Sequence, residues 1–263
     1  MEVYPYLQAV REKRPLVHHL TNWVTIYDCA QVVKSLGASP VMAHAPEEAA
    51  DMCGLASALV LNIGTLTPDL IVGMKQAATA ANGRDVPVVL DVCGAGATPF
   101  RDRKCFELLE DADIGVIKGN ASEMARIAGM NVRTRGVDAG EVESDLREIA
   151  CALARTRDCT VVVTGREDIV ADAGRLFLVG NGHELMTRVV GTGCMAASVI
   201  GAFAGASSLD VTAAVAAGLS CYGIAAELAA AKAAGPASFK LLLLDYLSTL
   251  SREEVESMQK VSG

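Results

Sequence analysis

Short apolar runs alternate with helical stretches along most of this chain, and the alternation is the strongest constraint on its fold. The runs read as strands over 16–20, 40–43, 58–63, 87–92, 114–117 and 160–163. Because they lack polar alternation, they are typical of strands buried on both faces of a parallel sheet. Thr67 and Pro68 form a capped start for a helix that should end near Ala81. The pattern predicts an α/β fold with a mostly parallel central sheet and helices on both faces.

The second half of the chain adds further helices. We expect helices over 140–157, over 211–234 and from about 237, and a hairpin over 169–179. Asp210 is the predicted cap of the Ala-rich second helix. No linker or low-complexity run divides the 263 residues, and one α/β domain can bury a chain of this length around a single core. We therefore predict one domain over residues 1–263.

The composition indicates a protein that acts on small molecules. The net charge of -8 argues against a nucleic-acid binder, which would carry basic clusters. The eight cysteines form no CxxC pair, so neither a zinc site nor a disulfide framework is indicated, and a reducing compartment fits best. Residues 1–14 carry charges and no apolar signal region, which favours a cytoplasmic location.

One apolar stretch has the length of a membrane span. No charged residue occurs between Arg188 and Asp210. The stretch is rich in Gly, Ser and Thr, and a helix that is apolar all round can equally be buried in a large core. We expect a buried core segment and no membrane contact.

A glycine-hinged turn, Gly191-Thr192-Gly193-Cys194, runs directly into a helix of small residues. The first turn of a helix leaves about four backbone N–H groups unpaired and carries partial positive charge. Since glycines let a phosphate approach the backbone closely, the turn predicts an anion site. The thiol of Cys194 would lie in that turn, where its pKa is lowered. The alternative is that the glycines serve close packing and that Cys194 is a small buried apolar residue.

Glycines also follow several of the predicted strands. Gly64, Gly94, Gly119 and Gly165 each lie within two residues of a strand end. In doubly wound α/β folds, ligands bind at the carboxyl ends of the strands. We therefore predict that the residues after these strands line one continuous ligand-binding edge of the sheet, here called the rim.

Two carboxylates lie on the same rim. Asp91 ends a predicted strand, and Glu123 opens a helix. Both could reach a Mg²⁺ ion through water molecules, because Mg²⁺ retains much of its hydration. Each also has a structural interpretation, since Asp91 could cap the following turn and Glu123 is favourable in a first helical turn.

Eight segments carry a resemblance to a known family. They are LTNWVT at 20–25, GASPVMA at 37–43, LNIGTL at 61–66, GAGATPF at 94–100, KGNASE at 118–123, VTG at 163–165, NGH at 181–183 and GTGC at 191–194. In this order, over nearly the whole chain, they resemble the hydroxyethylthiazole kinase family. The resemblance implies a ribokinase-like fold and transfer of the ATP γ-phosphate to the primary alcohol of 4-methyl-5-(2-hydroxyethyl)thiazole, a salvage step toward thiamine. It also implies a homotrimer with active sites between subunits.

The resemblance implies roles for residues on the acceptor side. Met42 and Gly191 would bind the thiazole, with Asn22 and Gly64 as nearby candidates. Cys194 occupies the position at which sugar kinases of the wider superfamily carry a catalytic aspartate. We expect it either to accept the hydroxyl proton late in the transfer or merely to line the site, because phosphoryl transfer has a loose transition state.

The resemblance likewise implies roles on the nucleotide side. Lys118 and Thr164 would bind ATP, and Asn120 and Gly193 lie beside them as further ATP-binding candidates. The two rim acids would be associated with Mg²⁺. Lys118 stands where the family often has an arginine. The positive charge is kept, but a lysine cannot bind a phosphate through two parallel N–H groups as a guanidinium does. We therefore expect the ATP affinity to differ from that of relatives.

The chain departs from the family pattern at two more positions. Val92-Cys93 stands where the family usually has Pro-Val, and His19 replaces a common cysteine. We expect His18 and His19 to serve packing or line the rim. His183 should lie in a turn that leads into a strand.

Other interpretations remain open. Trp23 could stack on a thiazole ring or pack at a subunit contact. A same-fold kinase for hydroxymethylpyrimidine, or a hydratase-type relative, would share the glycine turn but would usually carry Asp in place of Cys194. The alternative from another class is a non-catalytic oligomer that binds thiazole or nucleotide.

Overall fold

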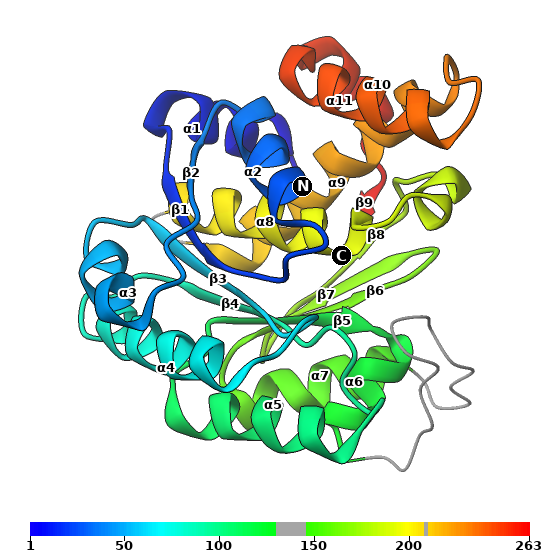
Figure 1. Ribbon diagram of the computed structural model, residues 1–263. Coiled ribbons are helices and arrows are strands. Elements are labelled where there is room, and N and C mark those ends of the chain that lie inside the picture. The colour runs from blue at the N-terminus through cyan, green and yellow to red at the C-terminus, as the bar shows by residue number, and fades with distance from the viewer. Residues whose placement is uncertain (130–145, 208–209) are drawn as a thin grey trace.

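A nine-stranded sheet crosses the computed structural model, which describes residues 1–129, 146–207 and 210–263 (Figure 1). The strands are β1 (Leu16–Leu20), β2 (Ser39–Val41), β3 (Ala58–Asn62), β4 (Val88–Asp91), β5 (Val116–Asn120), β6 (Thr160–Thr164), β7 (Asp168–Ala171), β8 (Leu176–Val179) and β9 (Val261–Ser262). Across the sheet they are ordered β2-β1-β3-β4-β5-β6-β7-β8-β9. Strands β1 to β6 pair in parallel, and β7, β8 and β9 add antiparallel at one end. The predicted mostly parallel sheet and the predicted hairpin are confirmed.

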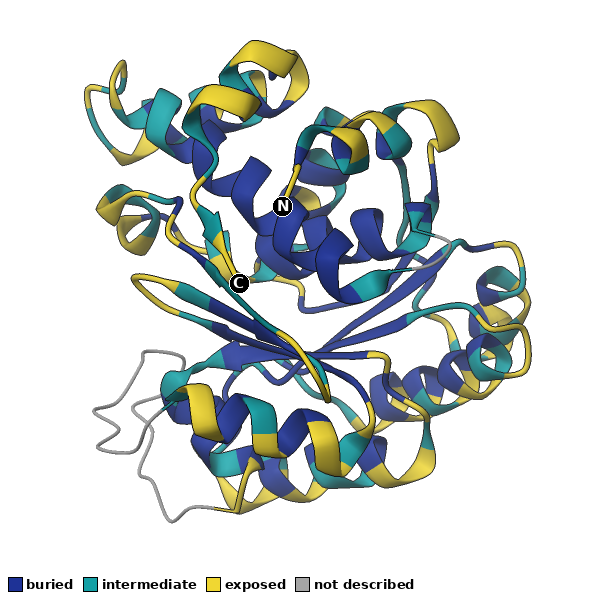
Figure 2. Cartoon of the chain, turned by 180° about the vertical axis from the view of Figure 1, so that it is seen from behind, coloured by how far each residue is buried: buried dark blue, intermediate teal, exposed yellow. Residues whose placement is uncertain are grey.

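Helices cover both faces of this sheet, as predicted (Figure 2). On one face lie α1 (Tyr4–Lys13), α2 (Ile26–Ser35), α8 (Thr192–Ala206), α9 (Val211–Ala230), α10 (Pro236–Thr249) and α11 (Arg252–Met258). On the opposite face lie α3 (Pro46–Cys53), α4 (Pro68–Asn82), α5 (Pro99–Asp111), α6 (Ala121–Ile127) and α7 (Leu146–Arg157). A 3-10 helix, η1 (Glu184–Arg188), precedes α8. Of the helix predicted over 140–157, residues 140–145 lie outside the described residues, and α7 forms the rest.

Alternate residues of each central strand contribute to two separate cores. In β3, Val60 packs with the helices on the α8 side, whereas Leu59 and Leu61 pack on the opposite side. Helix α8 lies so close to β3 that a Cβ on Gly201 would collide with the Val60 side chain. Gly201 within α8 therefore serves close packing against the sheet. The glycine turn at 191–194 lies at the start of the same helix.

Strand β5 extends further than the sequence predicted. It continues through Asn120, because the parallel ladder with β6 runs on until Asn120 lies opposite Thr164. Lys118 is therefore a strand residue and does not belong to the loop after the strand. Helix α4, by contrast, begins as predicted, with Thr67 Oγ1 accepting a hydrogen bond from Leu70 N at 3.2 Å.

Helix α9 is a central helix of the core. It is long and apolar enough to cross a membrane, but 83% of its most apolar window is buried inside the structure. As predicted, Asp210 caps it, and Ala213 N donates to Asp210 Oδ1 at 2.9 Å. The helix ends at Ala230 and not at the predicted Ala234, because the chain turns at 231–232.

Candidate active site

The order of the sheet reverses between β1 and β3. From β1 the chain passes to β2 on one side, and β3 then pairs with β1 on the other side. In open α/β sheets, ligands bind outside the carboxyl ends of the strands at such a switch point. Asn22 follows β1 and Gly64 follows β3. Two of the predicted acceptor-binding residues therefore lie where the topology favours a ligand.

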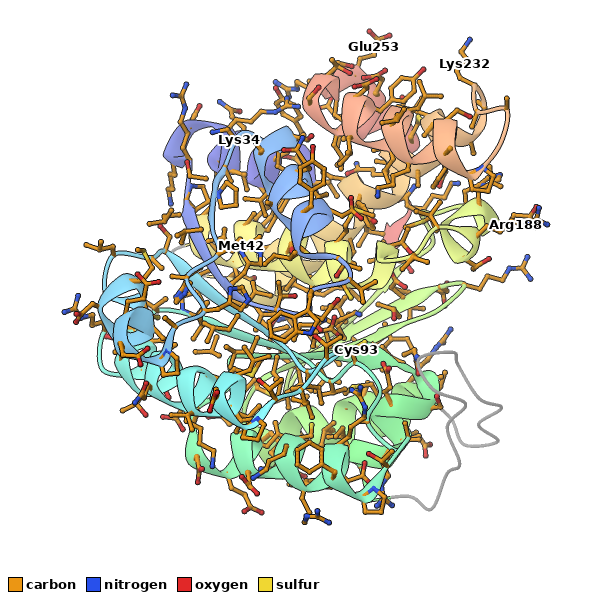
Figure 3. The ribbon with its side chains drawn as sticks, in the orientation of Figure 1. Lys34, Met42, Cys93, Arg188, Lys232 and Glu253 are labelled. Atoms are coloured by element: carbon orange, nitrogen blue, oxygen red, sulfur yellow. The ribbon has the colours of Figure 1, made fainter. Side chains whose placement is uncertain are left out.

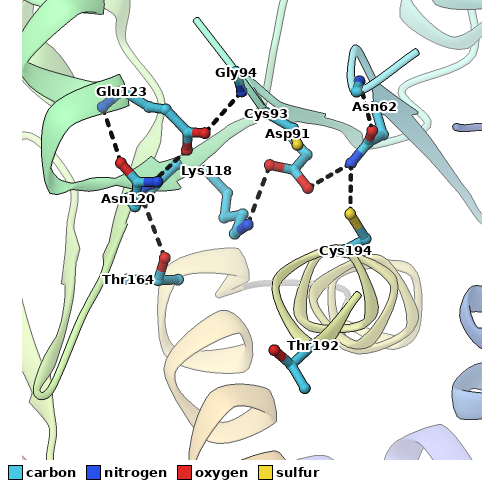
Figure 4. Close-up of polar contacts among 12 residues, drawn as sticks. Asn62, Asp91, Cys93, Gly94, Lys118, Asn120, Glu123, Thr164, Thr192 and Cys194 are labelled. Carbon is cyan, nitrogen blue, oxygen red and sulfur yellow. Dashed lines mark hydrogen bonds and ion pairs between the residues drawn. The ribbon is translucent and has the colours of Figure 1, made fainter. Parts of the chain in front are cut away.

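Three polar residues occupy matched positions at the ends of neighbouring strands. Asn62 of β3 lies opposite Asp91 of β4, and Asp91 lies opposite Lys118 of β5. Directly opposed residues direct their side chains to the same face of a sheet. All three side chains are buried. The register thus brings an amide, a carboxylate and an ammonium group together beside the start of α8 (Figure 4).

Lys118 and Asp91 form a buried ion pair, with Lys118 Nζ 3.1 Å from Asp91 Oδ1. Burial alone would lower the pKa of Lys118, but the carboxylates of Asp91 and Glu123 outweigh it and raise that pKa. A Cβ on Gly193 would lie 3.4 Å from Lys118 Nζ, so this cation is close to the first turn of α8. The structure therefore places a positive charge beside the predicted anion site.

The glycine turn enters α8 with the predicted geometry. Gly191 has a φ of +93°, in the left-handed region, and a Cβ there would lie 2.6 Å from Thr25 Cγ2. Thr192 and Gly193 are the first two helical residues, and Cys194 is the third. A glycine at the cap position supplies no side-chain acceptor for the unpaired N–H groups of the turn. This geometry suits the predicted anion site, and anion binding stays a prediction.

Two asparagines hold the sulfur of Cys194. Nδ2 of Asn22 and Nδ2 of Asn62 each donate to Cys194 Sγ at 3.4 Å. Asn22 Nδ2 also donates to Asn62 Oδ1 at 2.9 Å. Figure 4 shows Asn62 Nδ2 donating to Asp91 Oδ2, at 2.6 Å. Asn62 Oδ1 accepts a further hydrogen bond from Gly64 N at 2.9 Å. One hydrogen-bond network therefore joins Asn22, a predicted thiazole-binding residue, to Asp91, which is predicted to bind Mg²⁺, and to Cys194, the predicted base.

Cys194 is the more acidic of two neighbouring thiols. A hydrogen bond with the Cys93 thiol and the charge of Lys118 lower the pKa of Cys194 to about 7, against the effect of burial. The same contact, together with burial, raises the pKa of Cys93, which keeps its proton. The pKa of the Cys194 thiol is lowered as the sequence predicted, but the largest cause is the Cys93 thiol and not the helix terminus.

Glu123 fixes the glycine loop after β4 to the end of β5. Its Oε1 accepts from Gly94 N and its Oε2 from Asn120 N, both at 2.8 Å. Asn120 Oδ1 in turn accepts from Glu123 N at 3.0 Å, which completes a capping box at the start of α6. Burial raises the pKa of Glu123 to about 7. Opposite Asn120, the hydroxyl of Thr164 donates to Gly119 O at 3.3 Å.

The two predicted metal acids already accept hydrogen bonds through both of their oxygens. Within the described ranges, no group of three or more His, Cys, Asp or Glu side chains could hold a metal ion. Carboxylate oxygens nevertheless suit Mg²⁺, which keeps several waters and is usually bound with the help of substrate phosphates. Asp91 and Glu123 therefore fit a water-bridged ion held mainly by a nucleotide, and magnesium binding stays a prediction.

Met42 is linked through His44 to Thr21, the residue before Asn22. It follows β2, and its carbonyl accepts a hydrogen bond from His44 Nδ1 at 3.1 Å. Thr21 N, next to Asn22, donates to His44 Nε2 at 3.0 Å. Figure 3 shows Met42 and Cys93 at separate places in the structure. The structure brings Asn22, Gly64 and Cys194 into one network, whereas thiazole binding by Met42 stays a prediction.

The histidines singled out in the sequence have structural roles. His18 and His19 are fully buried, and burial lowers the pKa of His19 to about 3, so both serve packing and do not line the rim. The turn predicted at His183 does not form, because its backbone is extended and its Nδ1 accepts from Leu185 N at 3.2 Å. The prediction that a strand follows was wrong, because His183 caps the 3-10 helix η1.

Sequence reasoning gave no role to three residues that shape the site. Asn62 could have been found, since a polar residue at the end of a fully apolar strand is unusual unless it faces a site. Thr25 fixes Asn22, because its N and its Oγ1 both donate to Asn22 Oδ1 at 3.1 Å. Arg101 donates hydrogen bonds to backbone carbonyls of two loops elsewhere in the sequence, and no local sequence pattern indicates such contacts.

Comparisons with known proteins point to one family. The model of the hydroxyethylthiazole kinase family matches residues 7–253. The chain is 53% identical over 253 residues to hydroxyethylthiazole kinase from Methanosarcina acetivorans, and the match covers 96% of this chain and 97% of the relative. The structure of hydroxyethylthiazole kinase protein from Pyrococcus horikoshii OT3 is similar at a TM-score of 0.90 and 40% identity, over 99% of this chain and 98% of that one. A ribokinase-like superfamily protein from Enterococcus faecalis, 14% identical with a TM-score of 0.62 over 94% and 95% of the two chains, shares the fold alone.

Proposed function

This chain belongs to the hydroxyethylthiazole kinase family and has a ribokinase-like fold, and we propose that it transfers the γ-phosphoryl group of ATP to the primary alcohol of 4-methyl-5-(2-hydroxyethyl)thiazole in thiamine salvage. The observation that carries the proposal is the position of Asn62, whose amide donates to both Asp91 and Cys194. A cysteine whose thiolate form can accept a proton thereby lies next to the residues expected to act on the nucleotide.

The acceptor alcohol would bind on the side of the network formed by Asn22 and Gly64. Gly191 borders the same side, because Thr25 packs against it and also holds the Asn22 side chain. Met42 would complete the thiazole site. We infer that the alcohol oxygen faces Cys194 Sγ, since the two asparagine amides direct that sulfur toward the acceptor residues.

Charge neutralisation would come from the nucleotide side. Phosphoryl transfer passes through a loose transition state, so positioning and electrostatic stabilisation matter more than early removal of the alcohol proton. The ammonium of Lys118 and the backbone N–H groups at Gly193 and Cys194 are suited to this task, because they lie together at the start of α8. Thr164 and Asn120, opposed at the ends of β6 and β5, are the further ATP-binding candidates.

Cys194 would act as the base. A thiol with a pKa of about 7 is substantially ionised at neutral pH, and a weak base suffices when the proton leaves late. The hydroxyl proton would then pass to Cys194 Sγ as the oxygen–phosphorus bond forms. Asp91 and Glu123 would hold Mg²⁺ through water molecules. When bound, the ion would supply neutralisation of phosphate charge.

We further propose a homotrimer with active sites between subunits. Apolar side chains are exposed directly beside the acceptor residues, with Trp23 55%, Tyr27 71% and Val190 71% accessible. Exposed apolar side chains gathered next to a site are typical of an interaction surface. Sedimentation of the protein and of Tyr27→Asp tests this, and a wild-type monomer would contradict it.

We also propose a cytoplasmic location and a single kinase domain. All eight cysteines are free in the structure, in line with the predicted reducing, cytoplasmic compartment. A single sheet runs through the described residues, in line with one kinase domain over residues 1–263.

An ADP-release assay with competing acceptors tests the proposed function. The thiazole alcohol and hydroxymethylpyrimidine are offered together and separately, with ATP and Mg²⁺. We expect ADP release that depends on the thiazole alcohol. Release with the pyrimidine alcohol alone would indicate the same-fold alternative, and binding of either alcohol without ADP release would indicate a non-catalytic protein.

A further inference from the structure

We infer that Arg101 is a positioning residue that holds the acceptor-side loop after β3 in place against the glycine loop after β4. The inference rests on the proposed function, because those two loops would carry the two substrates. Arg101 lies in the first turn of α5, outside the network around Cys194.

The Arg101 guanidinium binds backbone carbonyls of both loops. Nη1 donates to Ile63 O at 2.6 Å and to Cys93 O at 3.2 Å, and Nη2 donates to Gly64 O at 2.7 Å. Ile63 and Gly64 follow β3, whereas Cys93 follows β4. A planar guanidinium presents several N–H groups in fixed directions, so it can bridge two chain segments in one geometry. The Arg101 side chain therefore joins the loops that follow β3 and β4, which carry residues of the candidate site.

Arg101 makes these contacts without a carboxylate partner. The ion pairs recorded for the described residues do not include Arg101. Its backbone is fixed as well, because Arg101 N donates to the Thr98 hydroxyl at the cap of α5, at 3.3 Å. A Cβ on Gly94 would lie 3.0 Å from Arg101 Nη1, so the glycine loop approaches the guanidinium closely. The side chain is placed to bind the loops and not to balance a nearby charge.

Each loop also has an anchor of its own. Gly64 N donates to Asn62 Oδ1 at 2.9 Å, and Gly94 N donates to Glu123 Oε1 at 2.8 Å. Loss of Arg101 therefore leaves the first loop tied to Asn62 of β3 and the second loop tied to Glu123 of α6, and it removes the guanidinium link between the two loops. Binding of each substrate should change little, whereas the alignment of the two should suffer. The expected signature is a lower kcat with nearly unchanged KM for the thiazole alcohol and for ATP.

Four variants test this inference. Arg101→Ala removes the hydrogen bonds between the guanidinium and the two loops. Arg101→Lys keeps the positive charge but loses the planar guanidinium that reaches both loops. Arg103→Ala is the matched control, because Arg103 lies on the same helix and is exposed. Asn62→Ala removes the anchor of one loop while Arg101 remains. Thermal melting first establishes that each variant is folded.

Kinetics give the first readout. We expect kcat of Arg101→Ala to fall at least about tenfold, since small misplacements of reacting groups have large effects on rate. KM should change less than about twofold, and Arg103→Ala should behave like the wild type. Added guanidinium ion at non-denaturing concentration should restore part of the rate of Arg101→Ala, and Arg101→Lys should remain slow. Wild-type kcat in Arg101→Lys, or a loss confined to KM, would overturn the inference.

Hydrogen–deuterium exchange gives a readout that does not depend on turnover. We expect faster exchange at 63–66 and 93–97 in Arg101→Ala than in Arg103→Ala, and Asn62→Ala should affect the first segment alone. Unchanged exchange at both segments would overturn the inference even if the wild type is an active kinase. Conversely, a wild type that releases no ADP with the thiazole alcohol refutes the proposed function and leaves the exchange result to decide on Arg101.

Discussion

Lys118 and Asp91 are directly opposed on neighbouring strands and form an ion pair at 3.1 Å, with side chains only 5% and 1% exposed. A buried charge without its partner is strongly destabilising, so each of these residues depends on the other. The pair also faces the first turn of α8, where the phosphoryl group would pass. We therefore expect both the free energy of unfolding and the catalytic activity to fall when this ion pair is broken.

Removal of the lysine charge should lower both stability and activity. Lys118→Met leaves the Asp91 carboxylate buried and unpaired, and we expect the free energy of unfolding to fall by about 3 kcal/mol. Activity should be lost, because the cation beside the phosphate site is gone. Lys118→Arg keeps the charge and should retain most of both. Urea unfolding and ADP release measure the two effects, and a Lys118→Met protein as stable as the wild type would contradict the importance of the pair.

The role of Cys194 can be decided by two substitutions and a pH profile. If the thiolate accepts the hydroxyl proton, Cys194→Ala should lower kcat by about 10²-fold. Wild-type kcat should rise as the pH rises through about 7, because only the ionised thiol can accept a proton. Cys194→Asp should remain active and shift that rise to lower pH, since a carboxyl ionises more readily. Unchanged kcat in both variants would mean that Cys194 only lines the site.

The left-handed conformation of Gly191 should not tolerate a side chain. Gly191→Ala places a Cβ at a φ of +93° and against the methyl group of Thr25, and we expect a loss of about 1–3 kcal/mol in the free energy of unfolding. Gly174→Ala is the matched control, because nothing lies within 4 Å of its Cβ position. Equal melting temperatures for the two variants would show that the turn is not constrained as described.

Burial of His19 should make the protein sensitive to acid. Its pKa is about 3 in the folded chain against 6.5 when unperturbed, so between these values the unfolded chain holds a proton that the folded chain lacks. Stability should therefore fall as the pH falls below about 6.5, by up to about 1.4 kcal/mol per pH unit from this residue. His19→Gln should flatten the dependence of the unfolding free energy on pH, whereas the exposed His183→Gln should not. A curve for His19→Gln as steep as that of the wild type would refute this.

The sequence predicted the layered fold well because several central strands contain continuous apolar runs. Runs such as 58–62 have few alternatives to a buried parallel strand, and the helix caps at Thr67 and Asp210 are local signals. The end of β5 was placed too early, because Lys118 and Asn120 are polar residues; pairing with β4 and β6 keeps Lys118 in the strand, and pairing with β6 keeps Asn120 there. Such pairing is not visible within one segment.

The sequence singled out several residues of the candidate site, but not Asn62, Thr25 or Arg101 and not the network of hydrogen bonds. Gly191 and Cys194 are recognisable from the glycine turn alone. The link from Asn22 through Asn62 to Asp91 depends on the register between β3 and β4, which the sequence does not reveal. The influence of Cys93 on the acidity of Cys194 likewise requires contact between residues a hundred positions apart.

The phosphorylated product is the most direct test of the proposed function. The protein is incubated with ATP, Mg²⁺ and the thiazole alcohol, and ADP and the phosphate ester of the alcohol are quantified by mass spectrometry. We predict that ester and ADP form in equal amounts and that Cys194→Ala slows both to the same extent. ADP formation without the ester, or no ADP formation at all, would contradict the proposal that the network around Asn62 and Cys194 transfers a phosphoryl group to this alcohol.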